Sequence, residues 1–296
     1  MDQQGRFDLV AYYDAYPQVE EQFQAALEES LHPRSPELLY DLVRGFGLPA
    51  GSRVIDVGCG EGGHSLRLAE RFGFSVRGVD PVQHHIGIAS EELRAAATTR
   101  PELQQKVSFT LGTAEQLPTE DTSIDLIWCR DVLVHVADLD RAYAEFHRIL
   151  RPGGRALVYQ MFGTNRLEPC EARWLFTTAG VVPSSAEPHR TEQAIAAAGL
   201  RIDDCLHLGT EWGEYAEENH GTAGRKLLHA ARLLRDPQRY TTRYGKPAYD
   251  IMLSDCLWHV YRMIGKLSPR TYLLSRPAHP RTRLHTSVPT THEVER

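Results

Sequence analysis

The chain has 296 residues, of which 42% are hydrophobic and 24% charged, and its formal net charge is −6. These values are typical of a globular protein and argue against sequence-independent nucleic-acid binding, which needs a strongly basic surface. No apolar run approaches the roughly 18 residues of a membrane span, and the first residues lack the features of a signal peptide. A cytoplasmic location is therefore expected. The five cysteines form no C-x-x-C pair, so they indicate neither a zinc site nor a redox pair.

Residues 1–47 are expected to form an N-terminal helical segment, with helices over 7–16, 19–31 and 36–46. The first of these carries three tyrosines within five positions, Tyr12, Tyr13 and Tyr16. Amphipathic rings at this density favour a lid that closes over a bound substrate, and packing of the helices on a sheet is the alternative. We therefore count the three tyrosines as candidate substrate-binding residues.

The central part alternates strands and helices. Strands are predicted at 53–57, 75–79, 107–111, 124–129 and 155–160, and two more at 200–206 and 270–274. Such alternation is typical of a doubly wound, mostly parallel α/β sheet with right-handed crossovers, here with seven strands. We expect this domain to span residues 48–276, with elements that cover the substrate at 161–265. Residues 161–187 read as irregular, 211–265 as mainly helical with interruptions near Pro237 and Pro247, and 277–296 as a disordered tail.

The first strand ends in an acidic residue and a glycine-rich turn, Asp56-Val-Gly58-Cys59-Gly60-Glu-Gly62, and a helical pattern follows directly. Strand, glycine turn and helix open a doubly wound domain, in which the turn lets a ligand lie against bare backbone. The spacing is G-x-G-x-G rather than the G-x-G-x-x-G of dinucleotide sites. Asp80 stands 24 positions after Asp56, where a carboxylate can accept both hydroxyls of a ribose.

Three further motifs stand in register with this turn: Asp80 after the second strand, Gly112-Thr113-Ala114-Glu115-Gln-Leu-Pro118, and Leu150-Arg-Pro152-Gly153-Gly154. Over about residues 50–160 the chain thereby resembles class I S-adenosylmethionine-dependent methyltransferases. The resemblance implies S-adenosylmethionine as cofactor, with Asp56, Cys129 and Arg130 near its methionine end and Thr113 and Ala114 beside the adenine. The family more often has Asp where Thr113 stands. The full set of candidate cofactor-binding residues is Asp56, Gly58, Cys59, Gly60, Asp80, Pro81, Thr113, Ala114, Glu115, Cys129 and Arg130.

Methyl transfer is an in-line displacement, and a base is needed where the nucleophile carries a proton. His135 is the first candidate base, since it lies just beyond the fourth strand, with Asp131 next. Glu168 and Glu171 form the second candidate group, for a reaction in which a methylated alkene becomes a carbocation that must lose a proton. There Trp174 would stabilise the cation, and Arg166 and Arg173 would hold a diphosphate. This faint resemblance to geranyl diphosphate C-methyltransferases implies Mg²⁺ bound with the diphosphate, and no metal otherwise.

Aromatic residues in the C-terminal third, Trp212 and Tyr215 above all, are expected to form a pocket wall. They favour a small, largely apolar metabolite of bacterial specialised metabolism, methylated at carbon, oxygen or nitrogen. Two alternatives stay open: a methyltransferase fold that catalyses a cyclisation with the cofactor as a structural ligand, and a non-catalytic protein that binds the cofactor. No nucleic-acid or membrane partner is expected, and a homo-oligomer is possible.

Overall fold

The computed structural model describes residues 9–278, so all but the first two residues of the expected tail at 277–296 lie outside it. The chain divides into two compact units that interleave along the sequence. We call them the helical unit (up to Leu42, Met161–Val181 and His207–Arg270) and the sheet unit (Val43–Gln160, Val182–Leu206 and from Thr271 onward).

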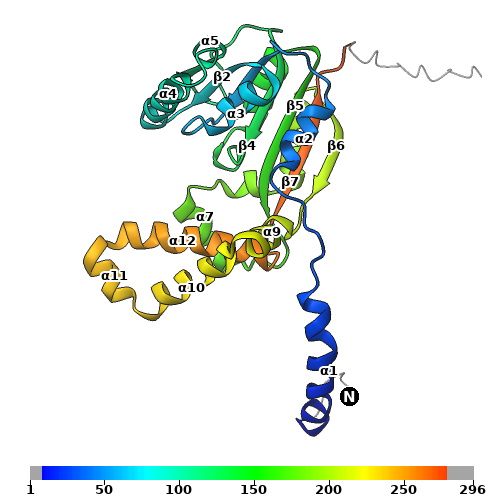
Figure 1. Cartoon of the computed structure of the whole chain (residues 1–296), viewed down its shortest axis with the longest axis vertical. Coiled ribbons are helices and arrows are strands. Elements are labelled where there is room, and N and C mark those ends of the chain that lie inside the picture. The colour runs from blue at the N-terminus through cyan, green and yellow to red at the C-terminus, as the bar shows by residue number, and fades with distance from the viewer. Residues whose placement is uncertain (1–8, 279–296) are drawn as a thin grey trace, which may run out of the picture. The chain divides into compact units, whose positions relative to one another are not determined.

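A seven-stranded sheet organises the sheet unit (Figure 1). Its strand order is β3-β2-β1-β4-β5-β7-β6, and β1 pairs in parallel with β2 and β4, as β2 does with β3 and β4 with β5. The order reverses direction at β1, which defines a doubly wound sheet and confirms the predicted fold class. The strands are β1 (Arg53–Val57), β2 (Ser75–Asp80), β3 (Val107–Leu111), β4 (Ile124–Arg130), β5 (Leu150–Gly163), β6 (Arg201–His207) and β7 (Leu267–Ser275).

The central strands form the core. Strand β4 is buried from Ile124 to Cys129, and β1 from Val54 onward. Burial on both faces explains why these strands read as continuous apolar runs rather than alternating ones. Helix α6 covers the sheet with a stripe that includes Tyr143 and Phe146, and Asp138 caps it by accepting a hydrogen bond from the Arg141 N–H (3.0 Å). The helices of this unit are α3 (Gly63–Phe72), α4 (Gln83–Ala97), α5 (Leu103–Lys106), α6 (Leu139–Ile149) and α8 (Pro188–Ala197), with short 3-10 turns η1 (Leu133–His135) and η2 (Pro183–Ala186); α2 (Leu38–Gly45) spans the boundary between the units.

The helical unit contains α1 (Leu9–Glu28), α7 (Pro169–Ala179), α9 (Glu211–His220), α10 (Thr222–Arg235), α11 (Pro237–Tyr244) and α12 (Lys246–Met263). The prediction that 161–187 is irregular was wrong, because α7 and η2 lie there. Helix α7 starts with a capping box in which Glu168 and Glu171 satisfy each other's backbone N–H groups, with Pro169 in its first turn. The predicted interruptions at Pro237 and Pro247 are confirmed, since each proline lies in the first turn of a new helix.

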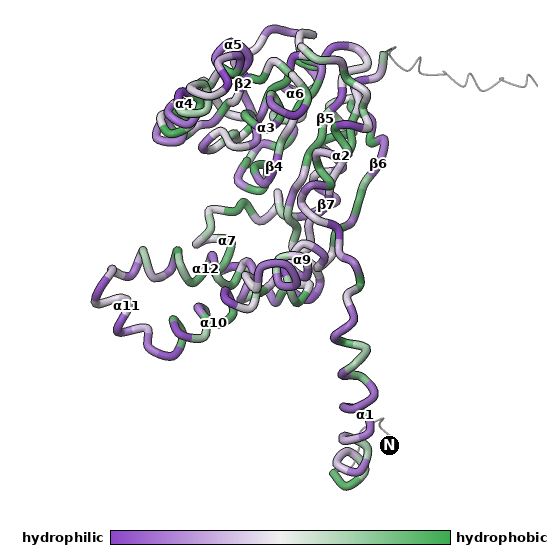
Figure 2. The backbone as a smooth tube through the Cα atoms, viewed as in Figure 1, coloured by the Kyte–Doolittle hydropathy of each residue, from purple (hydrophilic) through white to green (hydrophobic). Residues whose placement is uncertain are grey.

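Helix α1 is one continuous helix rather than the two predicted, and it passes through Pro17. None of its residues is buried, and Figure 2 shows hydrophobic and hydrophilic residues alternating along it. The segment after α1 is attached to α9, because Ser30 Oγ donates to Glu218 (2.8 Å) and Arg34 pairs with Glu211. Over residues 9–278, no helix has the length and apolarity that crossing a membrane requires.

Candidate functional site

A cavity of about 540 Å³ lies in the sheet unit, at the carboxyl ends of β1, β2 and β4. Crevices at this edge, where the strand order reverses, are the usual ligand sites of doubly wound sheets. Eight of the eleven candidate cofactor residues line it, together with the candidate base. They are Gly58, Gly60, Asp80, Pro81, Thr113, Ala114, Glu115 and Arg130, with His135.

The glycine turn forms one wall. The N–H groups of Gly58 and Cys59 both donate to the Val79 carbonyl (2.7 and 3.0 Å), which fastens the turn to β2. Gly58 has φ +71°, and a Cβ there would lie 2.1 Å from a methyl group of Val132, so only glycine fits. Gly60 differs, because a Cβ on it would meet no atom within 4 Å. Its bare backbone therefore faces open cavity, which a ligand can occupy.

Asp80 provides the second wall and is fixed in place before any ligand arrives. One carboxylate oxygen accepts the Gly60 N–H (2.9 Å), and the other accepts the Val82 N–H (2.9 Å). The ring nitrogen Nδ1 of His85 lies 3.2 Å from the second oxygen. His85 also lines the cavity, although the sequence analysis did not select it. Asp80 is 6% exposed, and the oxygen that accepts the Gly60 N–H retains a lone pair for a ligand hydroxyl, whereas the other oxygen retains one only when His85 does not donate to it.

The turn after β3 supplies the third wall. Thr113 pairs with Gln116 in an isolated bridge, which closes the turn. Ala114 is buried, and the Glu115 carbonyl accepts a hydrogen bond from Arg141 Nε (3.0 Å). The hydroxyl of Thr113 and the methyl group of Ala114 thus border the same space as Asp80, a combination that suits a flat, polar-edged base beside a ribose.

Three candidates do not line the cavity: Asp56, Cys59 and Cys129. Asp56 is 2% exposed and accepts a hydrogen bond from Ser65 Oγ (2.6 Å). Burial raises the pKa of Asp56 to about 7, and the nearby Asp80 carboxylate adds to the effect. Burial also raises the pKa of both thiols, which therefore stay protonated and pack as small apolar groups.

Arg130 closes the cavity at the end of β4, supported by residues that the sequence did not single out. Its Nη1 contacts Nε2 of His64 (2.5 Å), and its guanidinium lies over the ring of Tyr159 (5.8 Å). Burial, followed by the charge of Arg130, lowers the pKa of His64 to about 3. His64 is therefore neutral near pH 7, so it can accept a hydrogen bond from Arg130 without adding a second positive charge.

His135 and Asp131 follow β4 on a short, constrained segment. Asp131 has φ +57°, which few non-glycine residues adopt, and its N–H donates to the Tyr159 carbonyl (2.9 Å). The 3-10 turn η1 then exposes His135, whose N–H donates to the Val132 carbonyl (2.9 Å). Both side chains belong to residues that line the cavity.

The second group of catalytic candidates lies in the helical unit. Glu171 accepts hydrogen bonds from Lys266 Nζ (2.5 Å to each oxygen) and Tyr261 OH (3.1 Å), and its second oxygen accepts the Glu168 N–H (3.0 Å). Lys266 is the main reason that the pKa of Glu171 is lowered. Arg166 and Arg173 are exposed.

The aromatic residues predicted to bind the substrate differ in how far they are buried. Trp174 is half-buried against the hydrophobic cluster of α10 and α12, and Trp212 is 3% exposed, so its indole is a core group of the helical unit. Tyr215 is half-buried, with its ring 6.2 Å from that of His220. The three remaining candidates, Tyr12, Tyr13 and Tyr16, are exposed on α1. Over residues 9–278 no group of three or more metal-ligating side chains is found.

The sheet order and the cavity define a doubly wound α/β domain in which a fixed carboxylate, Asp80, faces a glycine turn across one cavity. Residues 55–158 match the methyltransferase domain family, and over this range the chain resembles the class I S-adenosylmethionine-dependent methyltransferases.

Individual relatives are consistent with this resemblance. Methyltransferase GfsG of Streptomyces halstedii is 35% identical over 125 residues, a match that covers 42% of each chain. The [4+2]-cyclase SpnF superposes with a TM-score of 0.62 at 22% identity, covering 90% of this chain and 95% of that one. A geranyl diphosphate C-methyltransferase of Streptomyces coelicolor superposes with a TM-score of 0.59 at 16% identity, covering 81% and 75%. The chain thus spans about two fifths of the length of the curated relative, and the two structural similarities concern the fold.

Proposed function

We propose that this protein transfers a methyl group from S-adenosylmethionine to a small, largely apolar metabolite. The proposal rests on one observation. The bare backbone of Gly60, the fixed carboxylate of Asp80 and His135 line the same cavity. When bound there, S-adenosylmethionine would supply an electrophilic methyl group on a sulfonium ion.

The lining residues fit this cofactor. After accepting the Gly60 N–H, one Asp80 oxygen keeps a lone pair for a ribose hydroxyl, and the second ribose hydroxyl would take the place of His85 at the other oxygen. Thr113 and Arg130 also line the cavity, where the Thr113 hydroxyl would bond the edge of the adenine and the Arg130 guanidinium would pair with the carboxylate of the methionine part. Asp56 would act from behind the glycine turn, through its charge, since it does not line the cavity.

His135 is the base that we favour, because it is exposed at the cavity that holds the cofactor. A neutral imidazole can take the proton of an acceptor hydroxyl as the oxygen attacks the methyl group, which makes O-methylation the leading reaction. Holding the acceptor oxygen in line with the methyl–sulfur bond contributes further, since alignment supplies about 7–11 kcal/mol in well-oriented reactions. Glu171 is the less favoured candidate base, because pairing with Lys266 lowers its pKa and so makes it less ready to take up a proton.

C-methylation of an isoprenoid-like carbon, with a prenyl diphosphate as the most specific substrate, is the second candidate. The contact between Glu171 and the Tyr261 hydroxyl favours it, since this carboxylate is held beside an aromatic side chain. The exposed cations Arg166 and Arg173 belong to the same unit and could bind a diphosphate, with Mg²⁺ carried in by that substrate.

The decisive experiment measures S-adenosylhomocysteine formation with two sets of acceptors, namely apolar phenols and geranyl diphosphate with Mg²⁺. The variants are His135→Ala and Glu171→Gln, with His84→Ala as a matched control, because His84 is exposed and does not line the cavity. We expect turnover of a phenol that His135→Ala loses while cofactor binding, measured by calorimetry, is kept. Product without stoichiometric S-adenosylhomocysteine would instead support a cyclase, and cofactor binding without any product from either set would support a non-catalytic role.

A further inference from the structure

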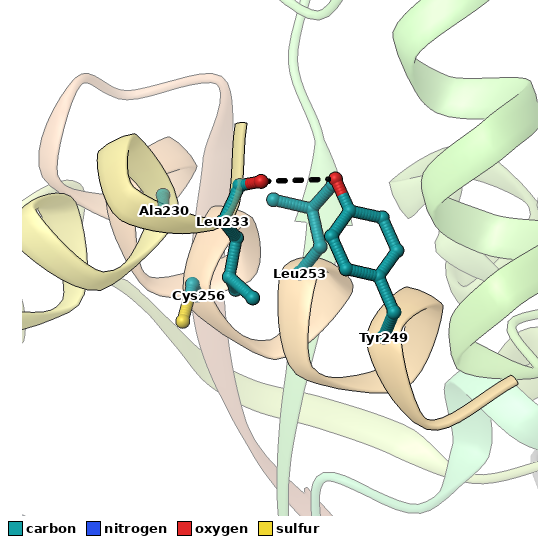
Figure 3. Packing of buried hydrophobic residues seen from close by; sticks show 5 residues of the cluster. All are labelled: Ala230, Leu233, Tyr249, Leu253 and Cys256. Atoms are coloured by element: carbon teal, nitrogen blue, oxygen red, sulfur yellow. Dashed lines mark hydrogen bonds between the residues drawn. The ribbon is translucent and has the colours of Figure 1, made fainter. Parts of the chain in front are cut away.

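A second cavity, of about 380 Å³, lies within the helical unit between α10, α11 and α12. Leu233, Tyr249 and Cys256 form its floor, and Ala230 and Leu253 complete the hydrophobic cluster to which these three belong (Figure 3). The Tyr249 hydroxyl points to the Leu233 carbonyl, to which it donates (3.4 Å), so the floor presents carbon and sulfur rather than a free polar group. Two further rings, those of Tyr240 and Tyr244, line the side formed by α11.

The rim of this pocket is positively charged. The charge belongs to Arg232, which lines the rim beside the imidazole of His229, and no carboxylate is among the lining residues. From 222 to 246 the sequence contains seven lysines and arginines against a single acid, Asp236, and that acid caps α11 by accepting the Arg239 N–H (3.1 Å).

The two lysines of the segment are already neutralised, so the surplus charge belongs to the arginines. Lys226 pairs with Asp255, and Lys246 with Asp250. Two arginines lie over the pocket's tyrosines, with Arg239 Cζ 6.0 Å from the centre of the Tyr240 ring and Arg243 Cζ 5.1 Å from that of Tyr244. An apolar, aromatic pocket bordered by cations without matching acids is complementary to an anion attached to an apolar body.

We propose that this pocket binds a soluble small molecule with an apolar body of one or two rings, or a short chain, and one anionic group such as a carboxylate, sulfonate or phosphate. The apolar body lies against Leu233, Tyr249 and Cys256, and Arg232 binds the anionic group. The site is distinct from the cavity of the methyl-transfer proposal, because none of the residues used here lines that cavity.

The test uses two dyes with one skeleton: 1-anilinonaphthalene-8-sulfonate, which is anionic, and N-phenyl-1-naphthylamine, which lacks the sulfonate. Fluorescence titrations of the full chain are expected to give saturable binding of both, with one site per chain. Arg232→Gln should weaken the anionic dye about tenfold, as expected for loss of a charge-assisted hydrogen bond, and leave the neutral dye unchanged. Arg235→Gln is the matched control, since Arg235 is exposed on the same helix but does not line the pocket.

A second pair of variants tests the location. Ala248→Trp fills the pocket from an exposed position and should abolish binding of both dyes, whereas Ile251→Trp, also exposed on α12 but outside the lining, should not. Circular dichroism checks that each variant is folded. If Ala248→Trp does not fold, Arg232→Gln and Arg235→Gln alone test the proposal. Dye binding that is equal in all four variants would overturn the proposal.

Two further results would overturn it in favour of another occupant. If the protein is a dimer by light scattering and Ala248→Trp makes it monomeric, the pocket receives a second copy, for which the acidic, apolar α1 is the matching segment. If phosphatidylglycerol vesicles bind the protein and Arg232→Gln and Arg235→Gln weaken this binding equally, the segment is a membrane-facing basic surface. Displacement of the dye by free dodecyl phosphate but not by the vesicles supports the proposed soluble ligand.

Discussion

Replacing Asp56 by Asn should make the protein more stable, and increasingly so as the pH rises. Burial raises the pKa of Asp56 from 3.8 to about 7 in the folded state. A raised folded-state pKa means that the proton stabilises the fold, so this stability is complete below pH 3.8 and is lost as the pH rises through about 7. The full shift of about three pH units corresponds to about 4 kcal/mol, at about 1.4 kcal/mol per unit.

Asparagine removes this loss, because it is neutral at every pH and its carbonyl can still accept the hydrogen bond from Ser65. Between pH 5 and pH 8 the advantage of Asp56→Asn in the free energy of unfolding should grow by about 2–3 kcal/mol. Urea denaturation at several pH values measures it, with Asp204→Asn as the control, since Asp204 is exposed. An advantage that does not change with pH, or a wild type that is more stable at pH 8, would refute the reasoning.

The same variant should bind S-adenosylmethionine less tightly, although it is more stable. A bound cation near the glycine turn would lower the pKa of Asp56, so the wild type should release protons on binding at pH 7. Calorimetry in two buffers of different ionisation enthalpy detects this release, and Asp56→Asn should show less of it. Equal proton release in both proteins would show that the pKa of Asp56 does not respond to the bound cofactor.

Three other substitutions test the site and the fold. Asp80→Ala should reduce S-adenosylmethionine affinity at least tenfold, with His84→Ala unchanged in the same calorimetric titration; equal affinities would remove Asp80 from the ribose position. Gly62→Ala should destabilise the fold by at least about 2 kcal/mol in urea unfolding, because its φ is +84° and a Cβ would lie 2.6 Å from an aromatic carbon. Gly60→Ala should cost only about 1 kcal/mol of stability but should lose cofactor affinity, and the reverse ranking would contradict the cavity assignment. Glu171→Gln should lower the melting temperature above pH 5 and lose this effect at lower pH, where the lysine-paired carboxylate, whose pKa is lowered, becomes protonated.

The centre of the sheet was accessible to sequence reasoning because β1 and β4 are buried along almost their whole length. Strands 53–57 and 107–111 were predicted to the residue, since the first is a mainly apolar run that ends at the glycine turn and the second alternates apolar and polar residues before Gly112. Helix α7 was missed because its residues mix polar and aromatic types without a clear period. The sequence nevertheless contains signals for the start of this helix, namely Pro169 and the Glu168–Glu171 spacing of a capping box.

Part of the cavity lining was predictable from the sequence, because several of its residues directly follow predicted strands. Asp80 and the glycine turn follow strands directly, so parallel pairing brings them together. The role of Glu171 could not be foreseen, because its partner Lys266 is 95 positions away and only the tertiary fold joins them. His64 was equally hidden, since its contact with Arg130 crosses from the first helix after the glycine turn to the end of β4.

The end of the described chain has a practical consequence for attaching other groups to this protein. Arg276 exchanges backbone hydrogen bonds with the turn before the long part of β5, where the Gly153 N–H donates to its carbonyl (2.8 Å) and its own N–H donates to Gly154 (3.0 Å). Leu150, which pairs with Ile124 at the start of β4, accepts a further bond from the Arg276 side chain. The chain therefore leaves the sheet at the edge where the parallel strands begin, opposite the cavity at their carboxyl ends. A fluorophore or affinity tag joined just after this residue would depart from the far edge and leave the entrance of the cavity clear.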